Sequence, residues 1–478
     1  MSNSTQFYIN GQWVDPITPN PMEVINPANE QAFATISSGT AADVDRAVAA
    51  AEAAFPAWGQ SSKEERLALL DKLDAIYERR KDEMAKAIST EMGAPIDLAT
   101  RAQTGVGQAH IKYFRKTLEA FEFEYHLNGD TRADMIIHEP IGVCGLITPW
   151  NWPLNQIALK VIAALAAGNC CVLKPSEVSP MSALLFAEMI DEAGFPAGTF
   201  NLVNGTGPEV GDAMSRHPKI DMMSFTGSAA AGIAVTKSSA DTVKRVVLEL
   251  GGKGANIVFA DSDIEKSVKR GAIQMFNNTG QSCNAPSRML VERSVYEDAV
   301  QVAAEAARST TVGDPAESGR HIGPLVSAQQ FERVQDMIQS GIDEGARLVE
   351  GGVGRPEGFN RGYFARPTVF ADVTHDMRIG REEIFGPVLS MMPFDDEAHA
   401  IEIANDTTYG LTNYVQTSDM EKAQRIARAM RAGMVSINGS FRAMDSPFGG
   451  MRQSGNGREG GKWGLEEFLE VKAISGWS

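Results

Sequence analysis

The residue whose setting most suggests chemistry is Cys283, in the stretch GQSCNAPSR. Its neighbours are small and polar, whereas Cys170 and Cys171 stand in the apolar run AAGNCCVLK, as core cysteines do. A nucleophilic cysteine needs a stabilised thiolate and access for its reaction partner, and Gly280 is consistent with access. The alternative is an inert, partly buried thiol. Cys283 is therefore a candidate nucleophile for an electrophilic carbon.

Two further residues could support such a nucleophile. Glu249 ends the strand-like run VKRVVLEL between two leucines, where burial would raise its pKa toward that of a general base. The alternative is an edge-strand glutamate that faces water. Asn151, in TPWNWPL, lies at a strand-to-helix turn, and its amide N–H could donate to a developing oxyanion. The alternative is the N-cap of the following helix.

Glycine-rich turns offer candidate phosphate sites. GTGPEVG, which contains Gly207, lacks the G-x-G-x-x-G spacing, and a plain strand-to-helix turn explains it equally well. FTGSAAAG follows an apolar run and opens an Ala-rich helix. Gly227 and Ser228 would present an N–H group and a hydroxyl at that helix N-terminus, where the helix dipole favours phosphate. A simple helix cap is the alternative.

The stretch LKPSE places Lys174 and Glu177 at the end of another strand-like run. Such side chains could hydrogen-bond the hydroxyls of a ribose. A carboxylate there would repel a 2′-phosphate, which favours NAD over NADP. The alternative is a solvated loop with a helix cap at Ser176 or Ser179.

The elements that would position these residues alternate along the chain. Residues 41–118 are helical in pattern, with a capping box at Ser62–Glu65, and Asn128-Gly129 marks a hairpin between two extended runs. Residues 142–260 alternate strands with helices, which predicts an α/β fold with a mostly parallel sheet. A second alternating segment covers about 253–450, with a helix expected from Asp263 to Asn277. Ligands of such sheets bind outside the carboxyl ends of the strands.

Composition narrows the class of protein. The chain has 478 residues, which is more than one hydrophobic core usually supports, and a formal net charge of -17. That charge argues against nucleic-acid and anionic-membrane partners. The four cysteines form no disulfide framework and no metal-ligand spacing, so we expect a reducing, cytoplasmic compartment and no metal site. No signal peptide or membrane-spanning run is evident.

Together these motifs resemble one family. TPWNWPL, LKPSE, FTGS, LELGGK, GQSCNAPSR, EEIFGPV and SPFGGMRQSGNGRE, in this order and at these spacings, resemble the aldehyde dehydrogenase superfamily over essentially the whole chain. The resemblance implies a Rossmann-type NAD-binding domain (1–120 and 141–252), an α/β catalytic domain (253–452) and a small β oligomerisation arm (121–140 and 465–478). It also implies a homodimer or homotetramer.

The resemblance implies a role for each candidate. Cys283 attacks the aldehyde carbon, Asn151 and the Cys283 backbone N–H hold the oxyanion, hydride passes to NAD, and Glu249 activates the water that hydrolyses the thioester. Glu459, in GREGG, matches a carboxylate that assists a proton relay. The implied cofactor-binding residues are Ile147, Trp150, Lys174, Ser176, Glu177, Gly207, Phe225, Gly227, Ser228, Gly232, Leu250, Glu383 and Phe385. The implied aldehyde pocket consists of Trp152, Gln156, Ser282, Asn284, Phe441, Met444 and Phe448.

That pocket set is mostly aromatic and apolar and contains no obvious cation, so we expect an uncharged aliphatic or aromatic aldehyde. Met451 and Arg452 depart from the residues frequent at their positions without affecting the chemistry. One rival function is a coenzyme A-acylating dehydrogenase, which tends to lack the glutamate that Glu249 provides. Another is a non-catalytic binding protein of the same fold, against which Cys283, Asn151 and Glu249 argue together. No histidine falls in the motifs, which disfavours a Cys–His acyltransferase.

Overall fold

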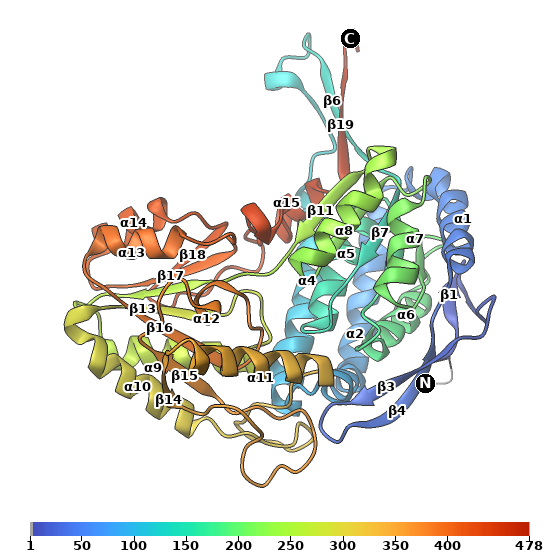
Figure 1. Ribbon diagram of the computed structural model, residues 1–478. Helices are drawn as coiled ribbons and strands as arrows, with labels where there is room; N and C mark the ends of the chain where they lie inside the picture. The colour runs from blue at the N-terminus through green and yellow to red at the C-terminus, as the bar shows by residue number, and fades with distance from the viewer. Residues whose placement is uncertain (1–2, 478) are drawn as a thin grey trace.

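The computed structural model describes residues 3–477, and its chain forms two lobes and a projecting arm (Figure 1). The first lobe is built on a seven-stranded sheet in the order β11-β10-β7-β8-β9-β1-β2. Its strands are β1 (Phe7–Ile9), β2 (Gln12–Val14), β7 (Val143–Ile147), β8 (Cys170–Lys174), β9 (Phe200–Leu202), β10 (Met222–Thr226) and β11 (Arg245–Glu249). Strand β7 pairs in parallel with β8 on one side and β10 on the other. The strand order therefore reverses at β7, the point where doubly wound sheets bind ligands.

Helices cover this sheet. They are α1 (Ala41–Trp58), α2 (Lys63–Met92), α3 (Ile96–Leu98), α4 (Thr104–Ala120), α5 (Pro153–Ala167), α6 (Met181–Ala193), α7 (Asp212–Arg216) and α8 (Ala229–Ser239). The predicted capping box begins α2: the Ser62 hydroxyl accepts from the Glu65 N–H at 3.1 Å, and the Glu65 carboxylate accepts from the Ser62 N–H at 2.8 Å. Cys170 and Cys171 are fully buried in the core of this lobe, as their apolar setting predicted.

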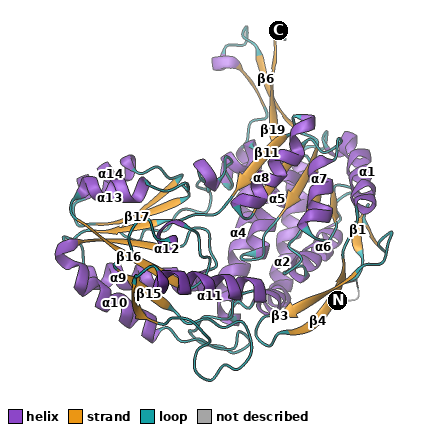
Figure 2. Cartoon of the chain, viewed as in Figure 1, coloured by secondary structure: helices purple, strands orange, loops and turns teal. Residues whose placement is uncertain are grey.

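The second lobe repeats the plan with a seven-stranded sheet in the order β14-β15-β16-β13-β12-β17-β18. The strands are β12 (Ala255–Val258), β13 (Arg288–Glu292), β14 (Arg347–Glu350), β15 (Thr368–Ala371), β16 (Val388–Phe394), β17 (Thr412–Gln416) and β18 (Met434–Ile437). Its helices are α9 (Ile264–Phe276), α10 (Tyr296–Ser309), α11 (Ala328–Asp343), α12 (Arg378–Arg381), α13 (Glu397–Asn405) and α14 (Met420–Ala429). Figure 2 shows helices on both faces of this sheet, and an apolar cluster lies on each face. The α/β fold class is confirmed.

The remaining strands form two small sheets. The arm is an antiparallel sheet of β19 (Leu469–Ile474), β6 (Met135–Pro140) and β5 (Glu124–His126), which projects beyond the first lobe (Figure 1). The predicted hairpin turn is present, with Asn128 at φ 57. Strand β19 pairs with residues 135–140 of the predicted arm segment 121–140. Strands β3 (Pro21–Asn26) and β4 (Gln31–Ser37) form a separate ribbon, and helix α15 (Gly461–Glu466) precedes β19.

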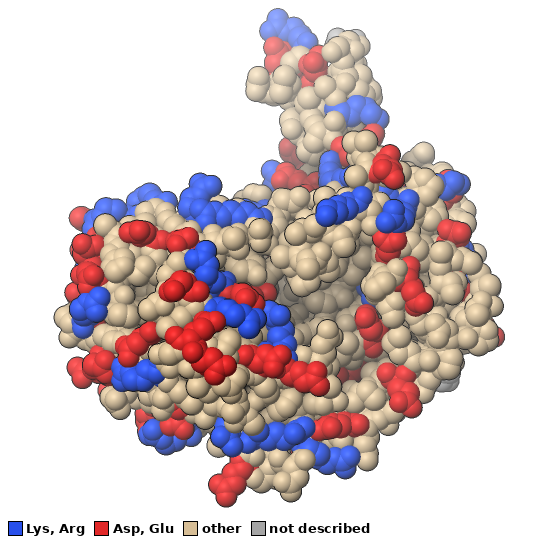
Figure 3. Space-filling model, viewed as in Figure 1, with Lys and Arg blue, Asp and Glu red and all other residues tan. Residues whose placement is uncertain are grey.

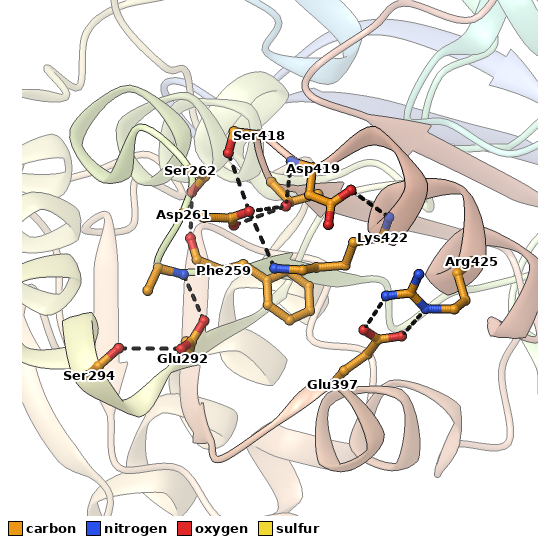
Figure 4. A network of polar contacts seen from close by, with 12 residues as sticks. Phe259, Asp261, Ser262, Glu292, Ser294, Glu397, Ser418, Asp419, Lys422 and Arg425 are labelled. Atoms are coloured by element: carbon orange, nitrogen blue, oxygen red, sulfur yellow. Dashed lines mark hydrogen bonds and ion pairs between the residues drawn. The ribbon is translucent and has the colours of Figure 1, made fainter.

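A polar network fastens the outer helices of the second lobe to its sheet (Figure 4). Asp261, just after β12, accepts from the Thr417 hydroxyl at 2.7 Å and pairs with Lys422 of α14 at 3.3 Å. The Lys422 ammonium also lies 4.8 Å from the centre of the Phe259 ring. This network lies where the helices contact the sheet. Its charged residues therefore have a packing role rather than a catalytic one.

Charged side chains of both signs are interspersed over the outer surface of the lobes (Figure 3). In the same view the surface is hollowed between the two lobes, and few charged side chains are seen in the hollow. On the face seen in this view, charged side chains therefore lie mainly on the exterior of the lobes rather than in the hollow between them.

Candidate active site

The candidate nucleophile lies on the segment that joins α9 to β13. After α9 a tight turn at 277–280 places Asn278 and Thr279 at positive φ, 52 and 58. Gly280 follows at φ +72, where a Cβ would come within 2.1 Å of the Gly386 carbonyl oxygen. Glycine is thus required at 280 by a close backbone approach. Cys283, three residues on, is a partly exposed free thiol, so the predicted access is present.

The electrostatic setting of Cys283 differs from the expected stabilised thiolate. Burial raises the pKa of the Cys283 thiol, and the carboxylates of Glu383, Glu249 and Glu459 raise it further. In this structure the thiol is therefore protonated at neutral pH. Because the thiolate is the nucleophile, a base or a change in the surrounding charge has to accompany catalysis.

Asn151 is held beside this segment rather than capping a helix. Its Nδ2 donates to the Gln281 backbone carbonyl at 3.0 Å, and α5 has no side-chain N-cap. A side-chain amide has two N–H donors, so the second remains for another acceptor. The neighbouring Trp152 donates its indole N–H to the Ser282 hydroxyl at 2.9 Å. These two bonds fix the start of α5 against the residues just before Cys283.

Glu249 is buried, as its flanking leucines predicted. It ends β11, the edge strand of the first sheet, and only 2 % of it is exposed. Neither carboxylate oxygen has a hydrogen-bond partner within residues 3–477. Burial raises the pKa of Glu249 well above its usual range, and the Glu459 carboxylate adds to this. The C-terminal segment closes over the carboxylate, because a Cβ on Gly449 would lie 2.6 Å from Glu249 Oε1.

A buried ion pair stands close to Glu249. Lys160 Nζ lies 2.7 Å from Glu459 Oε1 and 3.0 Å from the Ser224 hydroxyl, while Glu459 Oε2 has no partner in the described chain. Sequence reasoning proposed Glu459 but missed Lys160, which lies 299 residues away from it in the chain. The available signal was a single lysine inside the apolar helix NQIALKVIAALAAG.

The carboxyl ends of the first sheet gather several of the predicted cofactor residues. At the end of β8, Lys174 Nζ lies 3.1 Å from Glu177 Oε2 and 2.9 Å from the Pro175 carbonyl oxygen. Ile147 ends β7, and the Cβ position of Gly211 lies 3.5 Å from it. The Thr148 and Thr226 hydroxyls, just after β7 and at the end of β10, are buried without partners within the described residues. Unpaired buried hydroxyls at a strand-order reversal are suited to a polar ligand.

In the turn between β10 and α8 the backbone lies close to neighbouring groups of the protein. Ser228 caps α8, its hydroxyl accepting from the Ala231 N–H at 3.2 Å. The Gly227 N–H donates to the Glu249 carbonyl at 3.1 Å, and Phe225 is buried beneath the turn. A Cβ on Gly232 would lie 2.7 Å from Leu250 Cδ2. Ser228 therefore caps α8. The backbone N–H groups of the first turn that follows form a helix N-terminus of the kind that binds anions.

The alternative interpretation of LKPSE, in which Ser176 or Ser179 caps the next helix, is wrong. The N-terminus of α6 carries no side-chain cap from Ser176 or Ser179. Glu91 of α2 takes that role instead, accepting from the Met181 N–H at 2.6 Å. Ser176 accepts from the Val178 N–H at 3.3 Å, which closes the local turn. Gly207 begins a single turn, Gly207–Gly211, that Thr206 caps, and the space beside Gly207 is open.

The opposite wall of the cleft comes from the second lobe. Glu383 Oε1 accepts from the Gly252 N–H at 2.9 Å, and burial raises the pKa of Glu383 to about 7. The Phe385 and Trp150 rings meet edge to face, with their centres 5.3 Å apart. Lys253 is a residue that sequence reasoning missed: its Nζ is buried and has no partner in the described chain. Burial lowers the pKa of Lys253 to about 7.

One cavity of about 880 Å³ joins Cys283, Asn151 and the predicted aldehyde pocket. All of the predicted pocket residues line it: Trp152, Gln156, Ser282, Asn284, Phe441, Met444 and Phe448. The expectation that the pocket holds no cation is wrong, because Lys266, Lys269, Arg270 and Arg442 also line the cavity. The first three belong to one face of α9, which the motif set did not include.

Comparison with known proteins identifies the family of this chain. Residues 13–474 match the model of the aldehyde dehydrogenase family. A 3-succinoylsemialdehyde-pyridine dehydrogenase from Pseudomonas sp is 52% identical over 478 residues, which is 100% of this chain and 99% of that protein. The chain belongs to the aldehyde dehydrogenase family and is an oxidoreductase of that class.

Solved structures agree. An aldehyde dehydrogenase from Bartonella henselae superposes with a TM-score of 0.98 at 54% identity, covering 99% of both chains. A cysteine-to-alanine variant of aldehyde dehydrogenase C from Pseudomonas syringae, in complex with NAD+ and octanal, gives a TM-score of 0.98 at 49% identity, covering 100% of this chain and 98% of that one. Among residues 3–477, no helix has the length and apolar character needed to cross a bilayer.

Proposed function

We propose that this protein oxidises an uncharged aldehyde to the carboxylic acid with NAD, through a covalent intermediate on Cys283. The observation that carries the proposal is one cavity that holds Cys283 and Asn151, with a buried, unpartnered Glu249 close enough to raise the pKa of the Cys283 thiol. A nucleophile, an oxyanion donor and a base are the groups that acyl chemistry on a cysteine requires.

The residues at the strand-order reversal fit NAD. The unpaired hydroxyls of Thr148 and Thr226 and the open N-terminus of α8 suit a polar, anionic ligand. Lys174 and Glu177 would hold the adenosine ribose, and the Glu177 carboxylate disfavours the 2′-phosphate of NADP. Glu383 would hold the nicotinamide ribose, with Phe385 beside the ring. The Pseudomonas syringae relative in complex with NAD+ supports this assignment.

In the proposed mechanism the Cys283 thiol gives its proton to Glu249 through water, and its sulfur bonds to the aldehyde carbon. The carbonyl oxygen becomes an oxyanion, which accepts from the free Asn151 N–H and the Cys283 backbone N–H. When bound, NAD supplies the acceptor for the hydride that this carbon loses. Cys283 then carries a thioester.

Glu249 completes the reaction. Once the proton that Glu249 took from Cys283 has left, its carboxylate removes a proton from water; the resulting hydroxide attacks the thioester carbon, and the carbon–sulfur bond breaks to release the acid and the Cys283 thiolate. The proton on Glu249 can leave along the Glu459–Lys160 pair, whose Glu459 Oε2 is unpartnered within the described chain. The buried base supports hydrolysis over acyl transfer to coenzyme A.

The pocket supports an uncharged aldehyde despite the nearby cations. Lys266, Lys269 and Arg442 are exposed, and Arg270 donates a hydrogen bond to Gln416. The wall of the cavity also has apolar surface from Trp152, Leu159, Met444 and Phe448. Two relatives support this proposal: one was crystallised with octanal, and another is named for a pyridine-bearing semialdehyde.

The test is NADH formation with a graded panel of aldehydes, run with NAD, with NADP and with added coenzyme A, beside Cys283→Ala. We expect turnover with NAD that coenzyme A does not change and that Cys283→Ala abolishes. Cofactor binding without turnover on any aldehyde would support a non-catalytic binding protein instead. Faster turnover with a charged semialdehyde than with every neutral one would overturn the substrate assignment.

A further inference from the structure

A network of buried side-chain amides joins the first lobe to the segment that carries Cys283. Asn278, in the turn before Cys283, donates from Nδ2 to the Asn151 carbonyl oxygen at 3.0 Å and to the Gln281 carbonyl oxygen at 3.2 Å. The Gln281 oxygen also accepts from the Asn151 side-chain amide, at 3.0 Å. Asn278 therefore holds both the main chain of Asn151 and the acceptor that fixes the Asn151 amide.

Gln103 completes this network from the first lobe. Its Nε2 donates to Asn278 Oδ1 at 3.1 Å and to the Asn151 carbonyl oxygen at 3.4 Å. A primary amide has two N–H donors, so Gln103 can serve both oxygens. Met92 Sδ, 3.2 Å from Nε2, is a weaker acceptor beside them. If the amide were turned the other way, its own oxygen would face these two oxygens, so the network fixes its orientation.

The other end of the Gln103 amide is unsatisfied. Its Oε1 is buried and has no hydrogen-bond partner among residues 3–477. Leaving a buried polar atom unpaired costs stability, so packing alone would favour an apolar side chain at this position. What a glutamine adds here is the pair of N–H groups that face Asn278 and Asn151.

The helix that carries Gln103 is deformed at this residue. Residues 96–120 form one continuous helix of α3, η1 (Ala99–Gln103) and α4, in which η1 is a π-helical turn that ends at Gln103. Single π-helical turns within α-helices are rare and occur frequently at functional sites. The Tyr77 hydroxyl of α2 donates to the Thr104 carbonyl oxygen at 2.8 Å and so fastens the helix just after this turn. The direction of the Gln103 side chain is therefore set by a supported local deformation.

We propose that Gln103 is a positioning residue for the oxyanion: by holding Asn278 and the Asn151 main chain, it keeps the second Asn151 N–H directed into the cavity. This rests on the proposed function, in which that N–H stabilises the oxyanion formed when Cys283 attacks the aldehyde. Such stabilisation depends on donors that are held in place before the reaction. Loss of Gln103 should therefore slow attack on a carbonyl carbon without changing the reactivity of the thiol itself.

The experiment measures kcat/KM at saturating NAD for the best aldehyde of the panel and, separately, the rate at which iodoacetamide alkylates Cys283. Gln103→Met keeps a similar volume but has no N–H, and we expect its kcat/KM to fall about tenfold. Alkylation displaces iodide from a saturated carbon and forms no oxyanion, so its rate should stay close to that of the wild type. Gln108→Met removes another buried glutamine of α4, whose amide donates to Asp74 and Glu78, and should leave both rates unchanged.

A double-mutant cycle tests whether Gln103 acts through Asn151. Asn151→Ala removes the oxyanion donor and should lower kcat/KM by about 10²–10³. Adding Gln103→Met to Asn151→Ala should lower kcat/KM little further, because residues that act as a unit have effects that do not add.

The outcomes separate this inference from the function on which it rests. If the wild type oxidises no aldehyde, or Asn151→Ala is as fast as the wild type, the proposed function or its oxyanion step fails. If Asn151→Ala is slow but Gln103→Met is not, the role of Gln103 alone is overturned. The same follows if Gln103→Met slows alkylation as much as oxidation, or if the two substitutions are additive. Thermal midpoints identify a variant that fails to fold, and the isosteric Gln103→Glu, whose carboxylate has no N–H, then carries the same predictions.

Discussion

An unpaired carboxylate, Glu249, is the residue on which the proposed hydrolysis depends. Its raised pKa has a direct consequence for rate: at a given pH a smaller share of the base is ionised than for an ordinary glutamate, and that share grows as pH rises. The thiol of Cys283, whose pKa is also raised, responds in the same direction. We therefore expect kcat to increase from neutral to alkaline pH until other groups titrate or the fold fails.

Replacing the base should separate the two halves of the reaction. In Glu249→Gln the amide keeps the shape of the side chain but cannot take a proton, so steady-state turnover should fall by about 10²–10⁴. A first burst of NADH, up to one equivalent per subunit, should remain because thioester formation precedes hydrolysis, but it should be slower than in the wild type because Cys283 has lost the acceptor of its proton. Rapid-mixing absorbance at 340 nm measures both, with exposed Glu122→Gln as the control. A full steady-state rate in Glu249→Gln would remove this residue from the mechanism.

Local sequence predicted the burial or access of the candidate catalytic residues better than it predicted their electrostatics. Cys283, Glu249 and Asn151 stand in short motifs whose neighbours reveal burial or access. Lys160 could not be assigned, because its partner Glu459 is 299 residues distant and no periodic pattern joins them. The cations of α9 were missed for a similar reason. A helical pattern shows on which face of the helix a side chain lies, but not which cavity that face lines.

At the level of elements, the start of α6 depends on a residue of α2. Glu91 is buried and accepts from the N–H groups of Met181 and Ser182, in place of the serine caps that the local sequence suggested. Strand alternation, the capping box of α2 and the hairpin turn are local features and were predictable. A cap supplied from 90 residues away is a tertiary contact, which propensity and motif cannot detect.

Glu91 should make stability depend on pH in an unusual direction. Burial raises its pKa from 4.5 to about 7, so between these values the folded protein binds the proton that the unfolded chain has lost. The stabilisation from this group is complete below about pH 4.5 and is lost as pH rises to about 7, by about 3 kcal/mol. Glu91→Gln, which keeps an acceptor oxygen, should flatten this difference.

The measurement is the guanidinium midpoint at pH 5 and at pH 8 for the wild type and Glu91→Gln. Asp82→Asn, an exposed position on the same helix, serves as the control and should retain the wild-type difference. An equal change in midpoint for the wild type and Glu91→Gln would show that another group accounts for the pH dependence.

At the level of the whole molecule, a single chain does not explain why the arm exposes apolar side chains. Its strand β19 is an edge strand, with Val471 64 % exposed, and Trp477 near its end is 51 % exposed. Apolar side chains on an open edge favour association with another copy. We propose that the arm joins subunits in a homodimer or homotetramer, with the lobe around β7 as the cofactor domain and the lobe around β13 as the catalytic domain.

Val471→Asp tests the arm without deleting it. Light scattering after size-exclusion chromatography should give a multiple of 51.5 kDa for the wild type and a smaller species for the variant. Val471→Thr, which keeps the branched shape, should associate more nearly as the wild type does. A single-chain mass for the wild type would reject the proposal, and an unchanged assembly in Val471→Asp would place the interface elsewhere.

The ion pair of Lys160 and Glu459 also has a consequence for biosynthesis. At about 5–20 residues per second, the ribosome needs roughly 15 to 60 s to make the chain between these two residues. If the first lobe collapses around α5 during that time, the Lys160 ammonium is buried before the Glu459 carboxylate has been made. Glu249 likewise has no Gly449 to cover it until the last segment is made. A nascent chain is therefore inactive until it is almost complete, and a truncated product would expose this unfinished pocket to chaperones and proteases.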